Sequence, residues 1–471
     1  MSAPAAAERV LATLNADGSR RWIRPKPSHG KFWHRRRSVA YGLMLLFLAI
    51  PHFRLNDEPL MLLDLTRREF TLFGTTFLPT DTLLLMLLGI SGLIAIFLMT
   101  ALFGRVWCGW ACPQTVYMEF LFRPIERVIE GGWAKSRQMD KAGQHFHPRR
   151  IAKYAVYIVL AAILGNTFLA YFIGTDLLAH WMMQSPAEHP APFVVMAVTT
   201  VAMFIDFTWF REQTCLVACP YGRWQAVLLD KQSLIVSYDP NRGEPRMKPK
   251  KALPVMTTGG DCVDCGACVL TCPTGIDIRD GLQMECIHCT QCADACDAVM
   301  RRVGRPEGLI RYTSKEALAG HVRHMLRPRT VLYPLAFALF FGTFLYALGT
   351  KAKADVTVLG AIGQPFTREP DGSIVNQVRV KIANRSRATQ RYTVELLDAP
   401  GARVIAPELP LSIVNGKTVT TSLFVILPSE AFHDGSRKVR FKLSDGGAFT
   451  QEIVWLLRGP DDHEKGEERS K

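Results

Sequence analysis

Eight cysteines repeat one spacing pattern. The pattern is Cys-x2-Cys-x2-Cys-x3-Cys, and its two copies are Cys262, Cys265, Cys268, Cys272 and Cys286, Cys289, Cys292, Cys296. In such a run three thiolates close around one iron–sulfur cubane, and the fourth, beyond a turn, binds the neighbouring cubane. The sequence therefore predicts two 4Fe-4S clusters, the first bound by Cys262, Cys265, Cys268 and Cys296, the second by Cys272, Cys286, Cys289 and Cys292.

Two zinc sites, or cysteines that bind no metal, are the alternative interpretations of these runs. Zinc motifs rarely repeat three cysteines at two-residue gaps, which favours the clusters. Asp297 stands where Pro273 follows the first run, so the loop after Cys296 is expected to differ from the loop after Cys272. His288 lies between two predicted ligands, and we expect an exposed loop histidine there, the alternative being a residue that tunes the cluster by hydrogen bonding.

Two further cysteine pairs share the sequence Cys-x3-Cys-Pro, namely Cys108 with Cys112 and Cys215 with Cys219. A three-residue gap places two thiols on one helical face, and the proline disfavours helical geometry at the second cysteine, so each pair should end a helix. Together the pairs offer four thiolates, and soft sulfur ligands select Cu(I), zinc or iron–sulfur. The alternative is that these cysteines are small apolar side chains packed between helices.

Long apolar stretches must position these cysteines. The chain has 471 residues, of which 48% are hydrophobic, and a net charge of +14, a composition that excludes an intrinsically disordered chain and suggests a membrane. About 20 apolar residues are needed to cross a bilayer as a helix. We expect five membrane-spanning helices, at 38–53, 82–103, 154–175, 191–210 and 330–350. Asp206 in the fourth is expected to reach the membrane surface or to pair with Arg211, the alternative being a proton or metal relay.

The Lys and Arg distribution predicts the orientation of these helices. Nine basic residues fall between the second and third stretches, whereas residues 176–190 contain none. Because basic loops stay in the cytoplasm, the N-terminus and all 12 cysteines should be cytoplasmic and the C-terminal part should be periplasmic. A reducing compartment also suits free thiols. The basic segment 242–251 lacks interleaved aromatic residues, so anionic lipid headgroups are a better partner for it than nucleic acid.

The C-terminal part has the pattern of a β domain. Short alternating runs at 375–382, 392–397, 419–426, 439–443 and 449–456 are separated by turn dipeptides, which is typical of an immunoglobulin-like β-sandwich. The predicted organisation is a basic cytoplasmic tail at 1–37, four spans at 38–210, a cytoplasmic α+β dicluster ferredoxin domain at 211–329, a fifth span at 330–350, the periplasmic sandwich at 351–458 and a charged, disordered tail at 459–471.

The chain resembles the FixG/RdxA/CcoG family, accessory proteins of cbb3-type cytochrome c oxidases. The resemblance covers nearly the whole chain and rests on both ferredoxin runs and on RVWCGWACPQTV at 105–116, REQTCLVACPY at 211–221, LIVSYDP at 234–240 and PTGIDIRDGLQ at 273–283. It implies a multi-pass protein of the bacterial inner membrane, an oxidoreductase that reduces Cu(II) to Cu(I) during assembly of the oxidase copper centre. The partners it implies are a copper P-type ATPase, a copper chaperone and the oxidase subunits.

The hypothesis that joins both lines of reasoning is electron transfer. Electrons from a cytoplasmic donor would enter the two-cluster domain and reduce copper held near Cys108, Cys112, Cys215 and Cys219. One alternative is a subunit that oxidises quinol in the membrane. A second is a non-enzymatic assembly scaffold or redox sensor.

Overall fold

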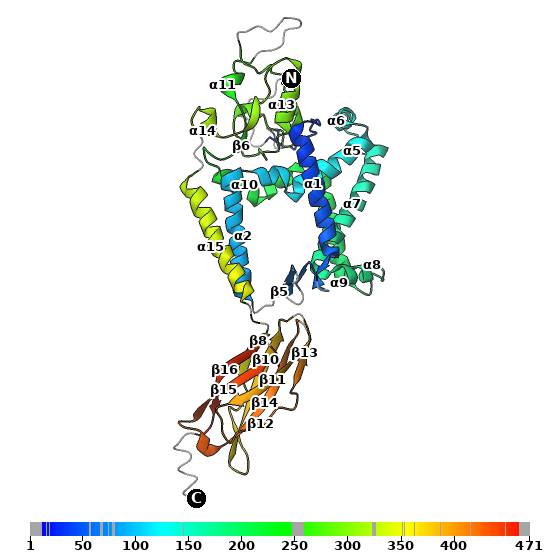
Figure 1. The fold of residues 1–471 in the computed structure, drawn as a ribbon. Coiled ribbons are helices and arrows are strands. Elements are labelled where there is room, and N and C mark those ends of the chain that lie inside the picture. The colour runs from blue at the N-terminus through cyan, green and yellow to red at the C-terminus, as the bar shows by residue number, and fades with distance from the viewer. Residues whose placement is uncertain are drawn as a thin grey trace. The chain divides into compact units, whose positions relative to one another are not determined.

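The computed structural model describes residues 12–15, 17, 19–55, 58–65, 69–73, 75–77, 81–144, 146–246, 259–322, 326–350, 352, 354–361, 363–386, 388–414, 416–447 and 449–460 (Figure 1). The chain divides into two compact units, Met1–Phe344 and Leu345–Lys471. The predicted disordered tail from residue 461 onward lies outside the described residues.

Four described helices are long and apolar enough to cross a membrane. They are α2 (Thr82–Phe103), α7 (Pro148–Ile173), α9 (Pro190–Ile205) with its π-helical continuation η4 (Asp206–Phe210), and α15 (Pro328–Gly349). Helix α7 packs along α9, where Gly165 lets the two backbones approach because a Cβ there would lie 3.2 Å from the Thr200 Oγ1 atom. Four of the five predicted spans are therefore confirmed by length and composition.

The first predicted span differs from the prediction. Helix α1 (Lys31–Ala49) begins seven residues before Ser38, includes Arg35, Arg36 and Arg37, and gives way at Ile50 to the 3₁₀ turn η2 (Ile50–His52). Its charge-free part, Ser38 to Ala49, measures roughly 18 Å at 1.5 Å per residue, well short of a bilayer core of about 30 Å. The expected count of five long apolar helices is thus corrected to four within the described chain. Helix α1 nevertheless runs beside α7, and the Tyr171 hydroxyl near the end of α7 donates to the Phe47 carbonyl at 2.8 Å (Figure 1).

Short helices and strands connect these long helices. Between α2 and α7 lie α3 (Val106–Trp110), α4 (Pro113–Tyr117), the π-helical η3 (Met118–Phe122), α5 (Arg123–Glu130) and α6 (Trp133–Lys141). Helix α8 (Thr175–Met182) precedes α9, and the π-helical η5 (Thr214–Ala218) and α10 (Pro220–Leu228) follow η4. Between α1 and α2 the chain forms β1 (Arg54–Leu55), β2 (Glu58–Pro59), β3 (Met61–Asp64), β4 (Glu69–Leu72) and β5 (Thr75–Phe77).

The cysteine-rich segment forms a small α+β module. Strand β6 (Ile235–Tyr238) pairs antiparallel with β7 (Ile310–Thr313), with Ile235 opposite Thr313. Helices α12 (Ala267–Thr271) and α13 (Gln291–Arg302) each begin within one of the two cysteine runs, and they pack on each other. The turns around them are α11 (Pro240–Gly243), η6 (Ile278–Asp280) and α14 (Lys315–Leu318).

The N-terminal segment packs on this module. The Lys26 backbone N–H donates to the Leu270 carbonyl at 2.8 Å. The Asp294 carboxylate of α13 accepts hydrogen bonds from the Phe32 and Trp33 N–H groups, at 3.1 and 2.7 Å, in the first turn of α1. These amides have no partner within their own helix, so Asp294 caps α1 from another element and fastens it to the module.

The second unit contains two antiparallel sheets around one core. The first has the order β12-β14-β10-β8, with β9 beside β10, and the second has the order β13-β11-β15-β16. Their bounds are β8 (Ala354–Gly360), β9 (Thr367–Arg368), β10 (Ser373–Asn384), β11 (Gln390–Leu397), β12 (Arg403–Ile405), β13 (Leu411–Ile413), β14 (Thr418–Pro428), β15 (Ser436–Ser444) and β16 (Thr450–Arg458), and η7 (Ser429–Ala431) follows β14. Alternate residues of both sheets, such as Val380, Leu423 and Phe441, are fully buried. All five predicted strand runs lie in these strands, with only Phe449 just outside β16.

Candidate iron–sulfur and thiolate sites

The two cysteine runs fold into loops of the same shape. Two residues after the first cysteine of each run, Asp264 and His288 have positive φ angles of 49° and 54°. Two residues further on, Gly266 and Thr290 have φ angles of 65° and 60°. Left-handed residues at these spacings curl the chain, so the duplication seen in the sequence is also a duplication of backbone conformation.

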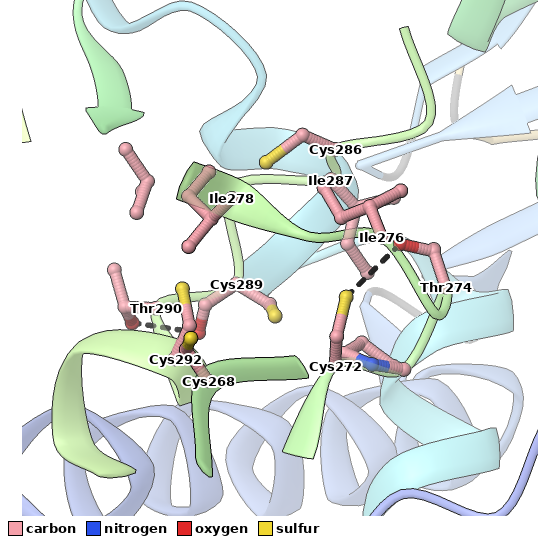
Figure 2. A pocket seen from close by; sticks show the side chains of 12 residues that line it. Cys268, Cys272, Thr274, Ile276, Ile278, Cys286, Ile287, Cys289, Thr290 and Cys292 are labelled. Carbon is pink, nitrogen blue, oxygen red and sulfur yellow. Dashed lines mark hydrogen bonds between the residues drawn. The ribbon is translucent and has the colours of Figure 1, made fainter. Parts of the chain in front are cut away.

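Five of the eight run cysteines line a single cavity: Cys268, Cys272, Cys286, Cys289 and Cys292 (Figure 2). Four of them are the predicted ligand set of the second cluster. The remaining walls of this cavity are mainly apolar side chains, including Ile276, Ile278 and Ile287. Such a surrounding excludes water and suits a group bound by thiolates.

The other predicted ligand set also lies together. Burial raises the pKa of the Cys296 thiol to about 12, and the nearby Cys268, Cys265 and Cys262 contribute to that shift. Cys265 is the exposed member, and the other three are buried. Among the described residues no three His, Cys, Asp or Glu side chains are arranged to hold a single metal ion. In a cubane each thiolate binds a different iron, and the two crossed donor sets fit two such groups.

The residue after each run decides how its helix ends. Helix α12 stops before Cys272, whose ψ of 123° leaves the helical region because Pro273 follows. Helix α13 instead continues through Cys296 to Arg302. The carboxylate of Asp297 in this helix accepts a hydrogen bond from the Gly308 N–H at 2.8 Å and thereby holds the following loop. The expected difference between the two loops is therefore observed.

Each Cys-x3-Cys-Pro pair ends a helix, as predicted. Cys112 has φ −60° and ψ 127° between α3 and α4, and Cys219 has φ −77° and ψ 110° between η5 and α10. Four residues before the first cysteine of each pair, the chain turns through a positive φ, 61° at Gly104 and 55° at Arg211. The two pairs are thus two copies of one structure, each placed directly after a long apolar helix.

The four thiols of these pairs lie close to one another. Burial raises the pKa of the Cys215 thiol to about 12, and Cys112, Cys108 and Cys219 add to the shift. Burial likewise raises the pKa of Cys108 to about 11, although the Arg105 charge opposes it. A metal ion that binds here must therefore displace protons, which a soft cation with high thiolate affinity can do.

The pairs also contact the cluster loops. Cys108, Ile287 and Cys289 form one buried cluster, and a Cβ on Gly109 would lie only 2.6 Å from the Ile287 carbonyl oxygen. Cys215 lines a second small cavity with Pro273, Thr274 and Ile287, and these three residues also line the cysteine cavity of Figure 2. Pro273, Thr274 and Ile287 therefore separate the cavity of the run cysteines from the cavity beside Cys215.

Two buried residues beside these thiols were not identified correctly from the sequence. His288 is 0% exposed, burial lowers its pKa to about 3, and its Nδ1 accepts from the Arg105 N–H at 3.3 Å, so the expectation of an exposed loop histidine is wrong. Arg36 is also 0% exposed and donates from Nε to the Gly109 carbonyl at 2.9 Å. Its two terminal nitrogens have no hydrogen-bond acceptor among the described residues, and its charge lies close to Cys289.

The expected pairing of Asp206 with Arg211 is also wrong. The Asp206 carboxylate accepts hydrogen bonds from Gln114 Nε2, at 3.2 Å, and from the Thr214 hydroxyl. Arg211 instead donates to both carboxylate oxygens of Glu126, at 3.1 and 3.2 Å. Within the described residues, the Asp206 carboxylate therefore has neutral hydrogen-bond partners and no cationic partner.

Glu126 is the centre of a buried ionic network. Its carboxylate pairs with Arg24, Lys153 and Arg211, which belong to the N-terminal segment, to α7 and to the chain before η5. Burial alone would raise the pKa of Glu126, but the three cations outweigh burial and hold that pKa well below its ordinary value. The network fastens the segments that carry the second cysteine pair to α5.

Comparisons with known families agree with this arrangement. Residues 210–315 match a family model described as a 4Fe-4S dicluster domain, and residues 85–131 match one described as a 4Fe-4S binding domain. Residues 344–455 match the model "IG-like fold at C-terminal of FixG, putative oxidoreductase". The chain is an iron–sulfur electron-transfer protein with membrane-spanning helices and an immunoglobulin-like C-terminal domain.

Curated relatives match the chain over most of its length. It is 34% identical to protein RdxA of Cereibacter sphaeroides over 90% of this chain and 94% of that protein. It is 30% identical to the nitrogen fixation protein FixG of Rhizobium meliloti over 92% of each chain, and 32% identical to protein RdxB of Cereibacter sphaeroides over 85% of this chain and 88% of that one. The chain belongs to the FixG/RdxA family.

Proposed function

We propose that this protein reduces Cu(II) to Cu(I), using electrons carried by two 4Fe-4S clusters, and so supplies Cu(I) for the copper centre of a cbb3-type cytochrome c oxidase. The observation that carries the proposal is the packing of the first cysteine pair on the second cluster loop, where Cys108, Ile287 and Cys289 belong to one buried cluster and Gly109 approaches the Cys289 backbone. A soft-metal thiolate set and a predicted cluster ligand therefore lie in neighbouring, packed segments, which gives an electron a short path between them.

The ligand sets divide the chemistry between them. The run cysteines Cys262, Cys265, Cys268, Cys296 and Cys272, Cys286, Cys289, Cys292 would hold two one-electron carriers. Cys108, Cys112, Cys215 and Cys219 offer four soft sulfur atoms to the substrate ion. Thiolates favour Cu(I) over Cu(II), so these side chains pull a bound Cu(II) ion toward acceptance of one electron.

The positions of the basic residues extend the proposal to orientation. With the basic segment between α2 and α7 in the cytoplasm, both cysteine sets lie at the cytoplasmic surface of a bacterial inner membrane and the immunoglobulin-like domain is periplasmic. The chain's partners would then be a copper chaperone, a copper P-type ATPase and the oxidase subunits, in keeping with its family.

Replacing Cys108, Cys112, Cys215 and Cys219 by serine tests the substrate site. Anaerobically purified protein should contain about eight iron atoms per chain, four for each of two clusters. Dithionite-reduced wild type should then reduce Cu(II), and the four-serine variant should not, while its iron content and cluster absorbance stay unchanged. Cu(II) reduction at the wild-type rate by the iron-loaded variant would refute the site. The matched control is Ser91→Ala in α2, a buried polar change away from both sets.

A further inference from the structure

A cavity of about 480 Å³ lies between α1, α7, α9 and the segment that carries the first cysteine pair. Most of its wall is apolar: Leu43, Met44, Phe47, Trp107, Ala111, Pro113, Val116, Leu164, Phe168, Met203 and Phe207. Its volume and its wall are those of a small-molecule site. Two of the helices that form it, α7 and α9, are long and apolar enough to cross a membrane, so a ligand of this cavity can come from the lipid phase.

The cavity has three polar wall residues, Asp206, Gln114 and Tyr117. Asp206 begins the π-helical turn η4, and Gln114 Nε2 donates to its carboxylate. Tyr117 is 8% exposed, and its hydroxyl has no hydrogen-bond partner among the described residues. A buried hydroxyl without a partner costs free energy, which a ligand oxygen at this position would recover.

The cavity also adjoins the proposed redox site. Ala111 and Pro113, the two neighbours of Cys112 in the chain, are both part of its wall. Trp107, next to Cys108, is a third wall residue. A ligand ring in the cavity would therefore lie within one residue of the four-thiol set.

We propose that this cavity binds the ring of a membrane quinol, which is the electron donor of the protein. The flat apolar ring of a quinol matches the aromatic wall of the cavity, and its two ring hydroxyls match the polar groups Asp206 and Tyr117. Its long apolar tail can extend into the lipid phase between α7 and α9. A lipid acyl chain would fill the same volume but would leave the Tyr117 hydroxyl unpaired.

Oxidation of one quinol to the quinone breaks two O–H bonds and releases two electrons and two protons. The inference rests on the proposed function for its electron acceptors, since each of the two one-electron carriers takes one electron. The half-buried Asp206 carboxylate accepts the first proton, releases it to solvent water, and then accepts and releases the second in the same way. Its hydrogen-bond partners among the described residues, Gln114 and Thr214, are neutral, so no cation within that part of the chain holds the carboxylate in its ionised form.

Binding is tested first with the full chain in lipid nanodiscs, whether or not it holds iron. Decylubiquinone should quench part of the tryptophan fluorescence, and Trp107→Phe should remove that part. Tyr117→Phe should weaken decylubiquinone binding about fivefold, the effect of one hydrogen bond. The control Tyr171→Phe changes a tyrosine of equal burial whose hydroxyl already donates to the Phe47 carbonyl, and it should bind like wild type.

Decylbenzene, which has the same tail and no ring oxygens, serves as the comparison ligand. It should bind more weakly than decylubiquinone and should not distinguish Tyr117→Phe from wild type. Equal affinity of the two compounds, with no effect of Tyr117→Phe, would overturn the proposal in favour of an acyl-chain site. Absence of decylubiquinone binding to folded wild type would also overturn it.

Reduction of the iron-loaded protein by decylubiquinol tests the role of Asp206. Asp206→Asn keeps the size of the side chain but cannot take up a proton, so the rate of cluster bleaching by decylubiquinol should fall at least tenfold. Bleaching by dithionite and the subsequent Cu(II) reduction should not change. If decylubiquinol binds and bleaches the clusters but Cu(II) is not reduced, the proposed copper function fails and the quinol site stands. If Cu(II) reduction works with dithionite alone and decylubiquinol never bleaches wild type, the quinol site fails by itself.

Discussion

Gly109 permits the contact between the first cysteine pair and the second cluster loop. A Cβ at this position would lie 2.6 Å from the Ile287 carbonyl oxygen and 3.0 Å from the Cys289 Cα atom. Ordinary contacts begin at 3.4 Å, so Gly109→Ala requires a shift of about 0.8 Å, the difference between 3.4 and 2.6 Å. The obstacles are backbone atoms, which cannot move aside as a side chain can.

The expected cost of this overpacking is roughly 1–3 kcal/mol of folding free energy. The shift also separates Cys108 from Cys289, so we expect slower Cu(II) reduction by protein that still contains its iron. The assay mixes dithionite-reduced protein with Cu(II) under anaerobic stopped flow and follows the return of cluster absorbance, with the rate expressed per iron-loaded chain.

Gly92→Ala is the matched control for this change. Gly92 lies within α2, and a Cβ there would meet nothing within 4 Å. This variant should keep both its stability and its rate of Cu(II) reduction. If Gly109→Ala and Gly92→Ala reduce Cu(II) equally fast, the contact between the two thiol sets is not the electron route and the central argument fails.

Three other changes probe residues around the thiols. Arg36→Gln removes the buried charge beside Cys289, so the potential of the second cluster should fall by roughly 60–130 mV, equivalent to about 1.5–3 kcal/mol, and an unchanged potential in an EPR-monitored titration would contradict this. Glu126→Gln should cost about 3–5 kcal/mol in denaturant unfolding at pH 7, because it leaves buried cations unpaired. The pKa of Glu126 is lowered in the folded protein. The extra unfolding free energy of wild type over Glu126→Gln should therefore be fully present above the ordinary pKa of 4.5 and should decline as the pH falls through the lowered pKa. Asp294→Ala should speed hydrogen exchange of the first-turn amides of α1, and an unchanged exchange rate would show that the cap is unimportant.

Cysteine spacing predicted the loop geometry because ligand spacing limits the backbone directly. The proline after Cys112 and Cys219 predicted where two helices end, since proline restricts the residue before it, and Pro273 ends α12 at Cys272 in the same way. The environment of His288 and Arg36 could not be predicted in the same way. Their burial results from the packing of α1 and of the chain after α2 on the cysteine module, and contacts between distant segments have no local pattern.

The strands of the C-terminal unit show the same distinction. Strand β8 carries a detectable alternation, with Ala354, Val356 and Val358 buried, but the predicted runs omitted it. Strand β12 (Arg403–Ile405) is exposed at all three positions, so no hydrophobic period exists to reveal it. Residues 403–405 form a strand because they pair with β14 at the edge of the sheet, and this pairing has no pattern in the local sequence.

The two cysteine pairs share a backbone path but are held by different means. Gly104 takes its positive φ at no steric cost, whereas Arg211 takes a similar one at an expected cost of about 1–3 kcal/mol. An arginine is nevertheless required at position 211, because its guanidinium donates to both carboxylate oxygens of Glu126 inside the ionic network. A glycine there would relieve the strain and lose that pairing. The first pair is thus positioned by close backbone packing on the cluster loop and the second by buried charge, so the four thiols depend on two independent supports.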